Sequence, residues 1–358
     1  MCWSHKYRLK QPDPFSNIKS PKSGEMKQIL AIAGFALLVC ACGGGTKKVE
    51  DKPLNAAPSF AGDSAMAYIK AQCDFGPRVP GSEAHRLCGD YIAAQFAGYG
   101  LAVTEQKALL TAWNGDRLPM RNIIASLHPE AKSRLLVTAH WDSRPWADND
   151  PDPANHHTAV MGANDGASGV AVMLEMARTL TSFDGECGVA RGDIGIDFIC
   201  FDCEDYGRAQ WSDVEDESGE TWALGAQHWA QTPHTIPYRA AWGVNLDMVG
   251  GREARFLREG FSRHYAPNTV QKVWDLAARL ALTKYFPAQD GGYTTDDHVP
   301  VNQRLSIPTI DIVTHYADNE RSAFGDTWHT VNDTPENIEK SVLQAVGTLM
   351  NTLVCNPF

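Results

Sequence analysis

Three apolar segments in this sequence each lead directly into acidic or histidine residues, and this recurrence constrains the fold more than any other feature. The segments and their polar ends are residues 134–139 with His140-Trp141-Asp142, residues 194–201 with Asp202-Cys203-Glu204-Asp205, and residues 241–246 with Asp247. Short apolar runs of this length are typical of buried strands. A single acid after a strand is most often an ordinary loop residue, but three such ends indicate a site where the strands end.

Segments with helical spacing alternate with the strand-like ones. We expect helices at residues 64–73, 85–99, 167–180, 223–230 and 267–282, and further strands at 101–106, 122–127 and 307–313. Thr334 is expected to cap a last helix, with Pro335 in its first turn. Strands that alternate with helices imply a largely parallel sheet covered by helices on both faces. Ligands of such sheets bind beyond the carboxyl ends of the strands, which is where the polar residues cluster.

A metal site can be assembled from three side chains of this sequence. Asp165 lies among small residues at a helix start, Asp205 follows a strand, and His329 precedes the last helix. Two carboxylates and an imidazole suit zinc better than calcium or magnesium. His140 and Asp247 could complete a second site with Asp165 as the bridge, and two metals would indicate metal-assisted hydrolysis. Taken alone, each residue also has an ordinary explanation, such as helix capping by Asp165.

Glu204 and Asp205 are adjacent, so their side chains diverge and can perform two different tasks. One carboxylate can hold a metal while the other carries protons. The structural alternative is a solvated acidic turn, because more acids follow within residues 213–220.

The net charge of −11 limits the kinds of partner that this chain can have. Hydrophobic residues make up 43% and charged residues 21% of the sequence, which excludes a disordered chain, a collagen-like fibre and a polytopic membrane protein. The acidic balance argues against a nucleic-acid partner, which would favour an excess of Lys and Arg. Residues 1–41 carry six basic residues and two acids, so the rest of the chain is more acidic than the total charge suggests.

A short apolar run near the N-terminus predicts export. Residues 29–41 are apolar and follow Lys27, and they are too few for a bilayer span of roughly 20 apolar residues. The segment Leu38-Val39-Cys40-Ala41-Cys42 resembles a bacterial lipobox, and a plain signal peptide cut nearby is the alternative. We therefore expect an exported, periplasmic protein whose contact with the membrane is a lipid anchor on Cys42.

We expect the chain to consist of a leader, a tether and one catalytic domain. Residues 1–25 are polar and are interpreted as an upstream over-call before a true start at Met26, and residues 26–41 as a lipoprotein signal peptide. Residues 42–60 are interpreted as a tether. This leaves residues 61–358 for a single zinc-dependent catalytic domain.

Six cysteines follow Cys42, and export makes disulfides possible. Their pairing cannot be deduced from the sequence. Cys200 and Cys203 lie three residues apart in or just after a strand, a spacing that places side chains on opposite faces. We therefore expect them to be buried free thiols rather than a zinc or redox pair.

These motifs together resemble the zinc aminopeptidase superfamily and, within it, the bacterial lipoprotein type of glutaminyl-peptide cyclotransferase. The resemblance covers residues 62–358 and rests on His140-Trp141-Asp142-Ser143, the small-residue stretch 162–169, Phe201-Asp202-Cys203-Glu204-Asp205, Asn245-Leu246-Asp247, Asp296-Asp297-His298-Val299-Pro300 and Trp328-His329-Thr330. The Asp-Asp-His motif with a later Trp-His is the part specific to the cyclases. The resemblance implies an α/β fold, a three-layer αβα sandwich with a mixed, mostly parallel central sheet.

The resemblance implies one Zn²⁺ per chain, held by Asp165, Asp205 and His329, with His140 available for a second metal. The substrates would be peptides or proteins with an N-terminal Gln, which is converted to pyroglutamate with release of ammonia. Zinc would polarise the γ-carbonyl of this Gln, and Glu204 would move the proton. The family often has Glu-Glu where this chain has Glu204-Asp205, so one metal ligand is shorter here.

Further residues take supporting roles by the same resemblance. Asp247 and Asp296 would organise the substrate amine and the proton path. Trp211 and Trp328 would form the walls of the pocket for the glutaminyl side chain. Asp311 stands where animal cyclases carry a His in a hydrogen-bond network, and we assign it to the substrate-binding residues.

Two other functions are compatible with the residues. A co-catalytic di-zinc aminopeptidase is the main alternative, because its ligands His140, Asp165, Asp205, Asp247 and His329 are all present. A non-catalytic peptide-binding or scaffolding lipoprotein is the third interpretation. Such a protein would be expected to have lost a metal ligand or the acid–base, and this chain has lost neither. Metal stoichiometry and the reaction product separate the two enzymes.

Overall fold

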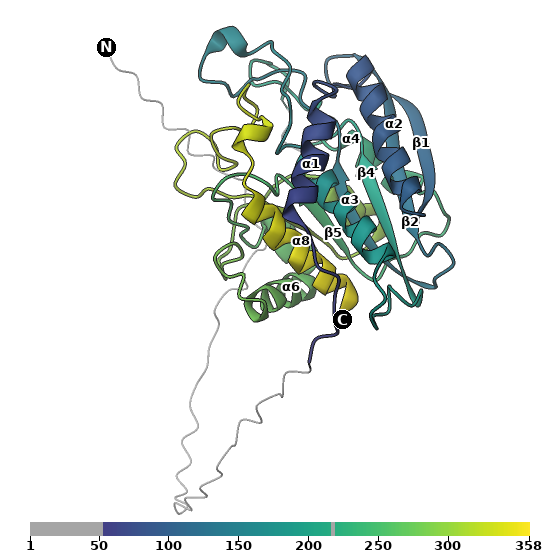
Figure 1. Ribbon diagram of the computed structural model, residues 1–358. Helices are drawn as coiled ribbons and strands as arrows, with labels where there is room; N and C mark the ends of the chain where they lie inside the picture. Colours follow the sequence, from purple (N-terminus) through teal and green to yellow (C-terminus); the bar gives the residue numbers. More distant parts are fainter. Residues whose placement is uncertain (1–52, 216–218) are drawn as a thin grey trace, which may run out of the picture. The chain divides into compact units, whose positions relative to one another are not determined.

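A six-stranded mixed sheet lies at the centre of the fold (Figure 1). The computed structural model describes residues 53–215 and 219–358. The strands are β1 (Ala102–Thr111), β2 (Arg117–Leu127), β3 (Ser133–His140), β4 (Ile194–Phe201), β5 (Gly243–Asp247) and β6 (Thr309–Val313), in the order β1-β2-β4-β3-β5-β6. Strands β4, β3, β5 and β6 pair in parallel, whereas β1–β2 and β2–β4 are antiparallel. The predicted α/β class with a mostly parallel sheet is confirmed.

Helices cover both faces of this sheet. They are α1 (Gly62–Cys73), α2 (Glu83–Gly98), α3 (Ala167–Thr181), α4 (Leu224–Gln231), α5 (Gly260–Tyr265), α6 (Pro267–Arg279), α7 (His298–Leu305) and α8 (Lys340–Cys355), with 3-10 turns η1 (Pro153–Asn155) and η2 (Pro335–Asn337). Helices α1, α2, α3, α6 and α8 share one core with alternate strand residues such as Val137, while α4 and α7 pack with Leu136 on the other face. Within the described residues, no helix is both long and apolar enough to cross a membrane.

Helix α3 approaches the sheet so closely that only glycine fits at one position of its first turn. A Cβ atom added to Gly169 would lie 2.2 Å from the backbone oxygen of Leu246 in β5. Glycine lacks this atom, so the helix backbone can lie against the strand. Its N-terminus, which carries Asp165, is thereby held near Asp247 at the end of β5.

The start of the last helix differs from the prediction. Thr334 caps no helix with its side chain; it precedes η2, and α8 begins only at Lys340. Between them Ile338 is extended and pairs with Gly251, and the Glu339 N–H donates to the carbonyl of Gly250. This pairing with a distant segment outweighs the local capping preference of Thr334. The short helices α5 and α7 were not predicted, because few residues carry their pattern.

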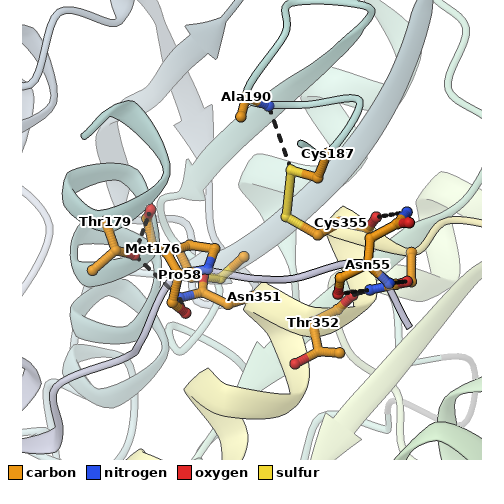
Figure 2. The surroundings of a disulfide bond; sticks show 10 residues. Asn55, Pro58, Met176, Thr179, Cys187, Ala190, Asn351, Thr352 and Cys355 are labelled. Carbon is orange, nitrogen blue, oxygen red and sulfur yellow. Dashed lines mark hydrogen bonds between the residues drawn. A yellow bond between two sulfur atoms is a disulfide. The ribbon is translucent and has the colours of Figure 1, made fainter. Parts of the chain in front are cut away.

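The end of the predicted tether is packed against the fold. Phe60 is buried, and Asn55 donates hydrogen bonds to Asn356 Oδ1 and to the carbonyl of Cys355 (Figure 2). Residues 53–60 therefore belong with the described fold, which corrects the C-terminal part of the tether assignment. The leader, Cys42 and residues 43–52 lie outside the described residues.

A disulfide joins Cys187, in the loop between α3 and β4, to Cys355 at the end of α8 (Figure 2). The other described cysteines, Cys73, Cys88, Cys200 and Cys203, are free and buried. This confirms the expectation for Cys200 and Cys203.

We expect the double substitution Cys187→Ala/Cys355→Ala to lower the free energy of unfolding by about 2–4 kcal/mol, because the crosslink closes a long loop in the unfolded chain. The disulfide lies where β4 begins, at the opposite edge of the sheet from the carboxyl ends of the parallel strands. Any kcat and KM measured below the unfolding transition should therefore not change. Denaturant unfolding with and without a reducing agent measures the effect, with Cys73→Ala as the matched control. A variant as stable as the oxidised wild type would contradict this expectation.

Candidate active site

A cavity of about 340 Å³ opens where the carboxyl ends of β4 and β5 meet the start of α3. Its lining includes five acids, one histidine and four aromatic residues: Asp165, Glu204, Asp205, Asp247, Asp296, His329, Trp222, Tyr293, Phe324 and Trp328. Polar residues predicted from two separate strand ends and from the loops that carry Asp165, Asp296 and His329 thus lie around one space. The arrangement follows from the parallel strands, whose carboxyl ends share one edge of the sheet.

Three of the lining residues form a compact set of metal-ligand atoms. The ligand atoms of Asp165, Asp205 and His329 all lie within 4.8 Å of one another, and all three residues are buried. His329 Nε2 is 3.1 Å from Asp205 Oδ1 and 3.6 Å from Asp165 Oδ2. Asp205 Oδ1 has no hydrogen-bond partner among the described residues. A buried acceptor without a donor, facing two other ligand atoms, fits a bound zinc ion.

The electrostatics of this set also favour a cation. Burial raises the pKa of Asp205, and the charge of Asp165 raises it further. Burial raises the pKa of Asp165 too, but the hydrogen bond from His140 and the charges of His140, His329 and Arg144 together outweigh burial and leave that pKa lowered. A positive charge bound between these two carboxylates would offset their repulsion and favour the ionised form of both.

The backbone around Asp165 is fixed by a second acid. The carboxylate of Asp333 accepts the N–H of Asn164 at 2.8 Å and the N–H of Asp165 at 3.0 Å. Arg78, which is fully buried, donates to the carbonyls of Met161 and Gly162 just before this turn. These bonds hold the start of α3 in one conformation, so Asp165 reaches the cavity in a defined position.

The turn after β4 directs Glu204 and Asp205 into the cavity. Cys203 adopts a left-handed conformation, with φ of 57°. The carboxylate of Asp142, at the end of β3, accepts the N–H of Glu204 at 3.1 Å and the N–H of Asp205 at 3.2 Å. Asp142 therefore orients both acids through their backbone.

Glu204 is a buried carboxyl group of the cavity. It is 8% exposed and lines the cavity beside Asp205. Burial raises the pKa of Glu204 well above its usual range; His140 opposes this, and the charges of Asp296 and Asp297 add to it. A buried carboxyl group whose protonated form is favoured in this way has the property required of a general acid–base.

A layer behind His329 was not predicted from the sequence. Asp148 Oδ1 lies 3.4 Å from His329 Nδ1, and Arg144 binds Asp148 through two hydrogen bonds of 2.8 and 2.5 Å. The Arg144 guanidinium also lies 3.6 Å from Asp205 Oδ1 and 4.8 Å from the centre of the Trp222 ring. Burial raises the pKa of Asp148, but hydrogen bonds from Arg144 and His329 outweigh burial. The net effect is a pKa below its usual value, so Asp148 is ionised. The spacing of four residues between Arg144 and Asp148, just after a strand end, was the sequence feature that could have indicated this pair.

We expect Asp148→Asn to weaken zinc binding by about ten- to a hundredfold, the usual cost of removing an outer partner of a metal-bound histidine. The carboxylate opposite His329 Nδ1 orients the ring and favours the tautomer whose Nε2 lone pair faces the metal. Competition with a chromogenic zinc chelator measures the affinity, and Asp152→Asn on the neighbouring exposed turn is the control. Equal affinities for Asp148→Asn and wild type would contradict this role.

A second group of ligand atoms adjoins the first. His140 Nε2 lies 2.9 Å from Asp165 Oδ1 and 3.3 Å from Asp247 Oδ1, and the three residues could hold a metal. Burial lowers the pKa of His140, but contacts with Asp142, Asp165 and Asp247 raise it well above its usual value. Burial raises the pKa of Asp247 to about 8. Either a protonated His140 or a second cation satisfies this arrangement.

The aromatic wall differs in one residue from the prediction. Trp328 lines the cavity and stacks on His329 with ring centres 3.7 Å apart, and the Trp222 ring centre lies 5.9 Å from that of His329. Trp211 is 44% exposed and is not among the described lining residues; its ring lies 4.6 Å from that of His157. Of these two tryptophans, Trp222 is among the described lining residues of the cavity and Trp211 is not. The position of Trp222, in the loop after β4 and just before α4, was the only local feature of the sequence that could have indicated a place on the wall.

Asp311 also lies elsewhere than a substrate-binding residue should. It is fully buried in β6 and is absent from the described lining of the cavity. Asn245 Nδ2 donates to Asp311 Oδ1 at 3.2 Å. Asp311 therefore lies in the layer behind Asp296 and not on the described wall of the cavity.

Comparison with known proteins is consistent with this geometry. Residues 122–354 match the model of peptidase family M28, and the chain belongs to that family. The glutaminyl cyclase of Bacteroides thetaiotaomicron, solved with N-acetylhistamine bound, is 44% identical, with a TM-score of 0.80 over 85% of this chain and 100% of that one. The Porphyromonas gingivalis glutaminyl cyclase is 47% identical, with a TM-score of 0.76 over 82% of this chain and 98% of that one.

A zinc-dependent exopeptidase from Parabacteroides distasonis is as similar, at 44% identity and a TM-score of 0.79 over 84% of this chain and 100% of that one. Among curated proteins, the glutaminyl-peptide cyclotransferase of Gloydius blomhoffii is 28% identical over 65% of this chain. The chain spans about 64% of the length of that relative. The predicted resemblance to the bacterial glutaminyl cyclases is confirmed.

Proposed function

We propose that this protein is a zinc-dependent glutaminyl-peptide cyclotransferase that converts an N-terminal Gln to pyroglutamate with release of ammonia. The observation that carries the proposal is the position of Glu204, a buried carboxyl with a raised pKa, beside the ligand set Asp165, Asp205 and His329 in one cavity. The similarity to two bacterial glutaminyl cyclases over nearly their whole length supports it.

The residues of the cavity suggest how the reaction would proceed. Zinc held by Asp165, Asp205 and His329 would supply Lewis-acid polarisation of the side-chain carbonyl of Gln. Glu204 accepts a proton from the substrate α-amine as the amine nitrogen bonds to the side-chain carbonyl carbon. Glu204 then returns the proton to the amide nitrogen, whose bond to that carbon breaks and which leaves as ammonia.

The other lining residues orient the substrate. The carboxylates of Asp247 and Asp296 face the cavity and can accept hydrogen bonds from the α-amino group. The indoles of Trp222 and Trp328 present apolar surface to the glutaminyl side chain, which excludes water that would otherwise yield Glu. Because amine and amide belong to one residue, holding a single rotamer provides much of the acceleration.

Two peptides that differ only in their first residue test the function. With a Gln-initiated peptide we expect ammonia release and loss of the mass of one ammonia, whereas the Leu-initiated peptide should remain intact. Mass spectrometry and an ammonia assay follow both reactions, and the Glu204→Gln variant corrects for spontaneous cyclisation. Free Leu from the second peptide without cyclisation of the first would overturn the proposal.

A second candidate function rests on the group formed by His140, Asp165 and Asp247. Their ligand atoms lie within 4.8 Å of one another, so two metals that share Asp165 could be bound, as in a co-catalytic aminopeptidase. Free Leu together with two zinc ions in these neighbouring groups would support this function instead.

Export to the periplasm and a lipid anchor on Cys42 are also proposals. The disulfide between Cys187 and Cys355 supports export, because such bonds persist in oxidising compartments. Incorporation of labelled palmitate that Cys42→Ser abolishes would support the anchor, and incorporation that survives this change would argue against it.

A further inference from the structure

A row of aromatic side chains leads away from the mouth of the cavity. Tyr293 lines the cavity and is 56% exposed, so its ring lies where the cavity opens to solvent. The Phe261 ring packs against that of Tyr293 with ring centres 5.0 Å apart, and the Tyr265 ring stacks on that of Phe261 at 6.2 Å. Phe261 and Tyr265 lie in α5, are partly exposed and are not among the described lining residues of the cavity. These three residues are called the aromatic row below.

The aromatic row is held in place by its own backbone contacts. The Tyr293 ring lies so close to the first residue of α5 that a Cβ atom added to Gly260 would be 2.6 Å from it. The carboxylate of Glu259, the N-cap of α5, accepts the N–H of Phe261 at 2.7 Å and the N–H of Thr294 at 2.9 Å. One side chain thus joins the loop of Tyr293 to the helix of Phe261. Because the rings are ordered before a ligand arrives, binding to them costs little conformational entropy of the protein.

The charged side chains next to the aromatic row are paired with one another. Arg263, which lies in α5, contacts Asp290 at 3.2 Å and donates to the carbonyls of Arg258 and Gly291. Asp290 also pairs with Arg258 at 2.8 Å. A chain that lies along the row therefore meets aromatic carbon atoms with these charges already neutralised. Such a surface favours apolar and aromatic side chains over charged ones.

The position of the aromatic row identifies the substrate peptide as its occupant. The proposed reaction takes place on an N-terminal Gln inside the cavity, so the rest of the peptide leaves through the mouth. An extended chain advances by about 3.3–3.6 Å per residue. The second residue then lies at the mouth beside Tyr293, and the third and fourth residues come within reach of Phe261 and Tyr265. The row is thus continuous with the cavity that binds the Gln.

We propose that the aromatic row binds apolar or aromatic side chains at the third and fourth positions of a Gln-initiated peptide. This inference rests on the proposed function and adds a substrate class to it, namely chains that are apolar at these two positions. A contact between two aromatic rings is worth about two- to tenfold in an equilibrium constant. The effect should appear in KM, because contacts remote from the reacting atoms stabilise the bound substrate and the transition state alike.

Two peptides that differ only in their third and fourth residues test the aromatic row: Gln-Gly-Phe-Phe-Gly and Gln-Gly-Ser-Ser-Gly. With the wild-type protein we expect kcat/KM to be about tenfold higher for the Phe peptide, mainly through a lower KM. Equal values for the two peptides would overturn this inference while leaving the proposed function intact. If neither peptide is cyclised, the proposed function is wrong and this inference is overturned with it.

Variants show whether the row itself causes the preference. Phe261→Ala removes the central ring and should lower the tenfold ratio between the two peptides to about twofold. Phe358→Ala, an equal change at a 43% exposed ring near the C-terminus, should keep the wild-type ratio. An undiminished ratio in folded Phe261→Ala would refute the inference. If that variant does not fold, Tyr293→Ala decides the question, because any effect of Tyr293 on the Gln itself is common to both peptides.

Binding without turnover gives an independent measurement. Titration calorimetry of the Glu204→Gln variant should give a Kd about tenfold lower for the Phe peptide than for the Ser peptide. A second copy of this chain is the competing occupant of the row. If light scattering shows a dimer for the wild type and a monomer for Phe261→Ala while the two peptides bind equally, the row is a self-association surface and the inference is overturned.

Discussion

Replacing Glu204 with Gln is expected to lower kcat by about a hundred- to ten-thousandfold, the usual contribution of a general acid–base. Gln fills nearly the same volume in the cavity, and Asp142 would still accept the backbone N–H of residue 204. What disappears is a group that can take the proton from the amine and give it to the leaving nitrogen. Zinc should remain bound, because the predicted ligands Asp165, Asp205 and His329 are unchanged.

Steady-state kinetics with a Gln-initiated peptide and metal analysis of the same preparation check this expectation. Glu130→Gln is the matched control, because Glu130 is exposed between β2 and β3, at the opposite edge of the sheet. Full activity of Glu204→Gln would exclude the proton-transfer role. Loss of zinc from this variant would instead place Glu204 among the ligands.

Replacing Asp205 with Asn should weaken zinc binding by more than about a hundredfold, since even outer partners of metal ligands are worth about ten- to a hundredfold. The carboxylate charge next to Asp165 would be lost, although the amide oxygen could still face the cation. Turnover should fall with the zinc content. Without zinc, however, the variant should be at least as stable as wild type, because repulsion between Asp165 and Asp205 disappears.

Thermal unfolding with and without zinc separates these effects. Zinc should raise the Tm of the wild type, because it binds the folded state, and should leave the Tm of Asp205→Asn nearly unchanged. Asp193→Asn, at the exposed start of β4, is the control and should respond to zinc like the wild type. Equal zinc affinity in Asp205→Asn and wild type would exclude Asp205 as a ligand.

Local pattern predicted most of the sheet but not every element that completes the fold. Residues 194–201 form β4 as expected, because a short apolar run between turns carries its own signal. The start of α8 was misplaced, because the extended conformation of Ile338 depends on pairing with Gly251. Helix α7, which brings Asp296 and His298 to the site, is too short for its periodicity to be read from the sequence.

In the candidate site, too, some residues could be predicted from local pattern and others only from tertiary packing. Asp165, Glu204, Asp205 and Asp247 were proposed from the sequence because each stands next to the end of a strand or the start of a helix, and parallel strands bring such ends together. His329 stands in a loop and was proposed from its residue type and its Trp-His motif. The choice between Trp211 and Trp222 could not be made in this way. Both belong to one long loop, and only its packing against Arg144 and His329 places Trp222 on the wall.

The sequence by itself determined the class of fold, the edge of the sheet that carries the chemistry and the family resemblance, because these depend on periodicity and on residues that are close along the chain. Tertiary structure alone decided that Arg144 and Asp148 stand behind His329, that Asp311 lies beneath the cavity, and that Tyr293, Phe261 and Tyr265 form one row of rings. Those features depend on distances between side chains from separate elements, which strand register and loop packing set.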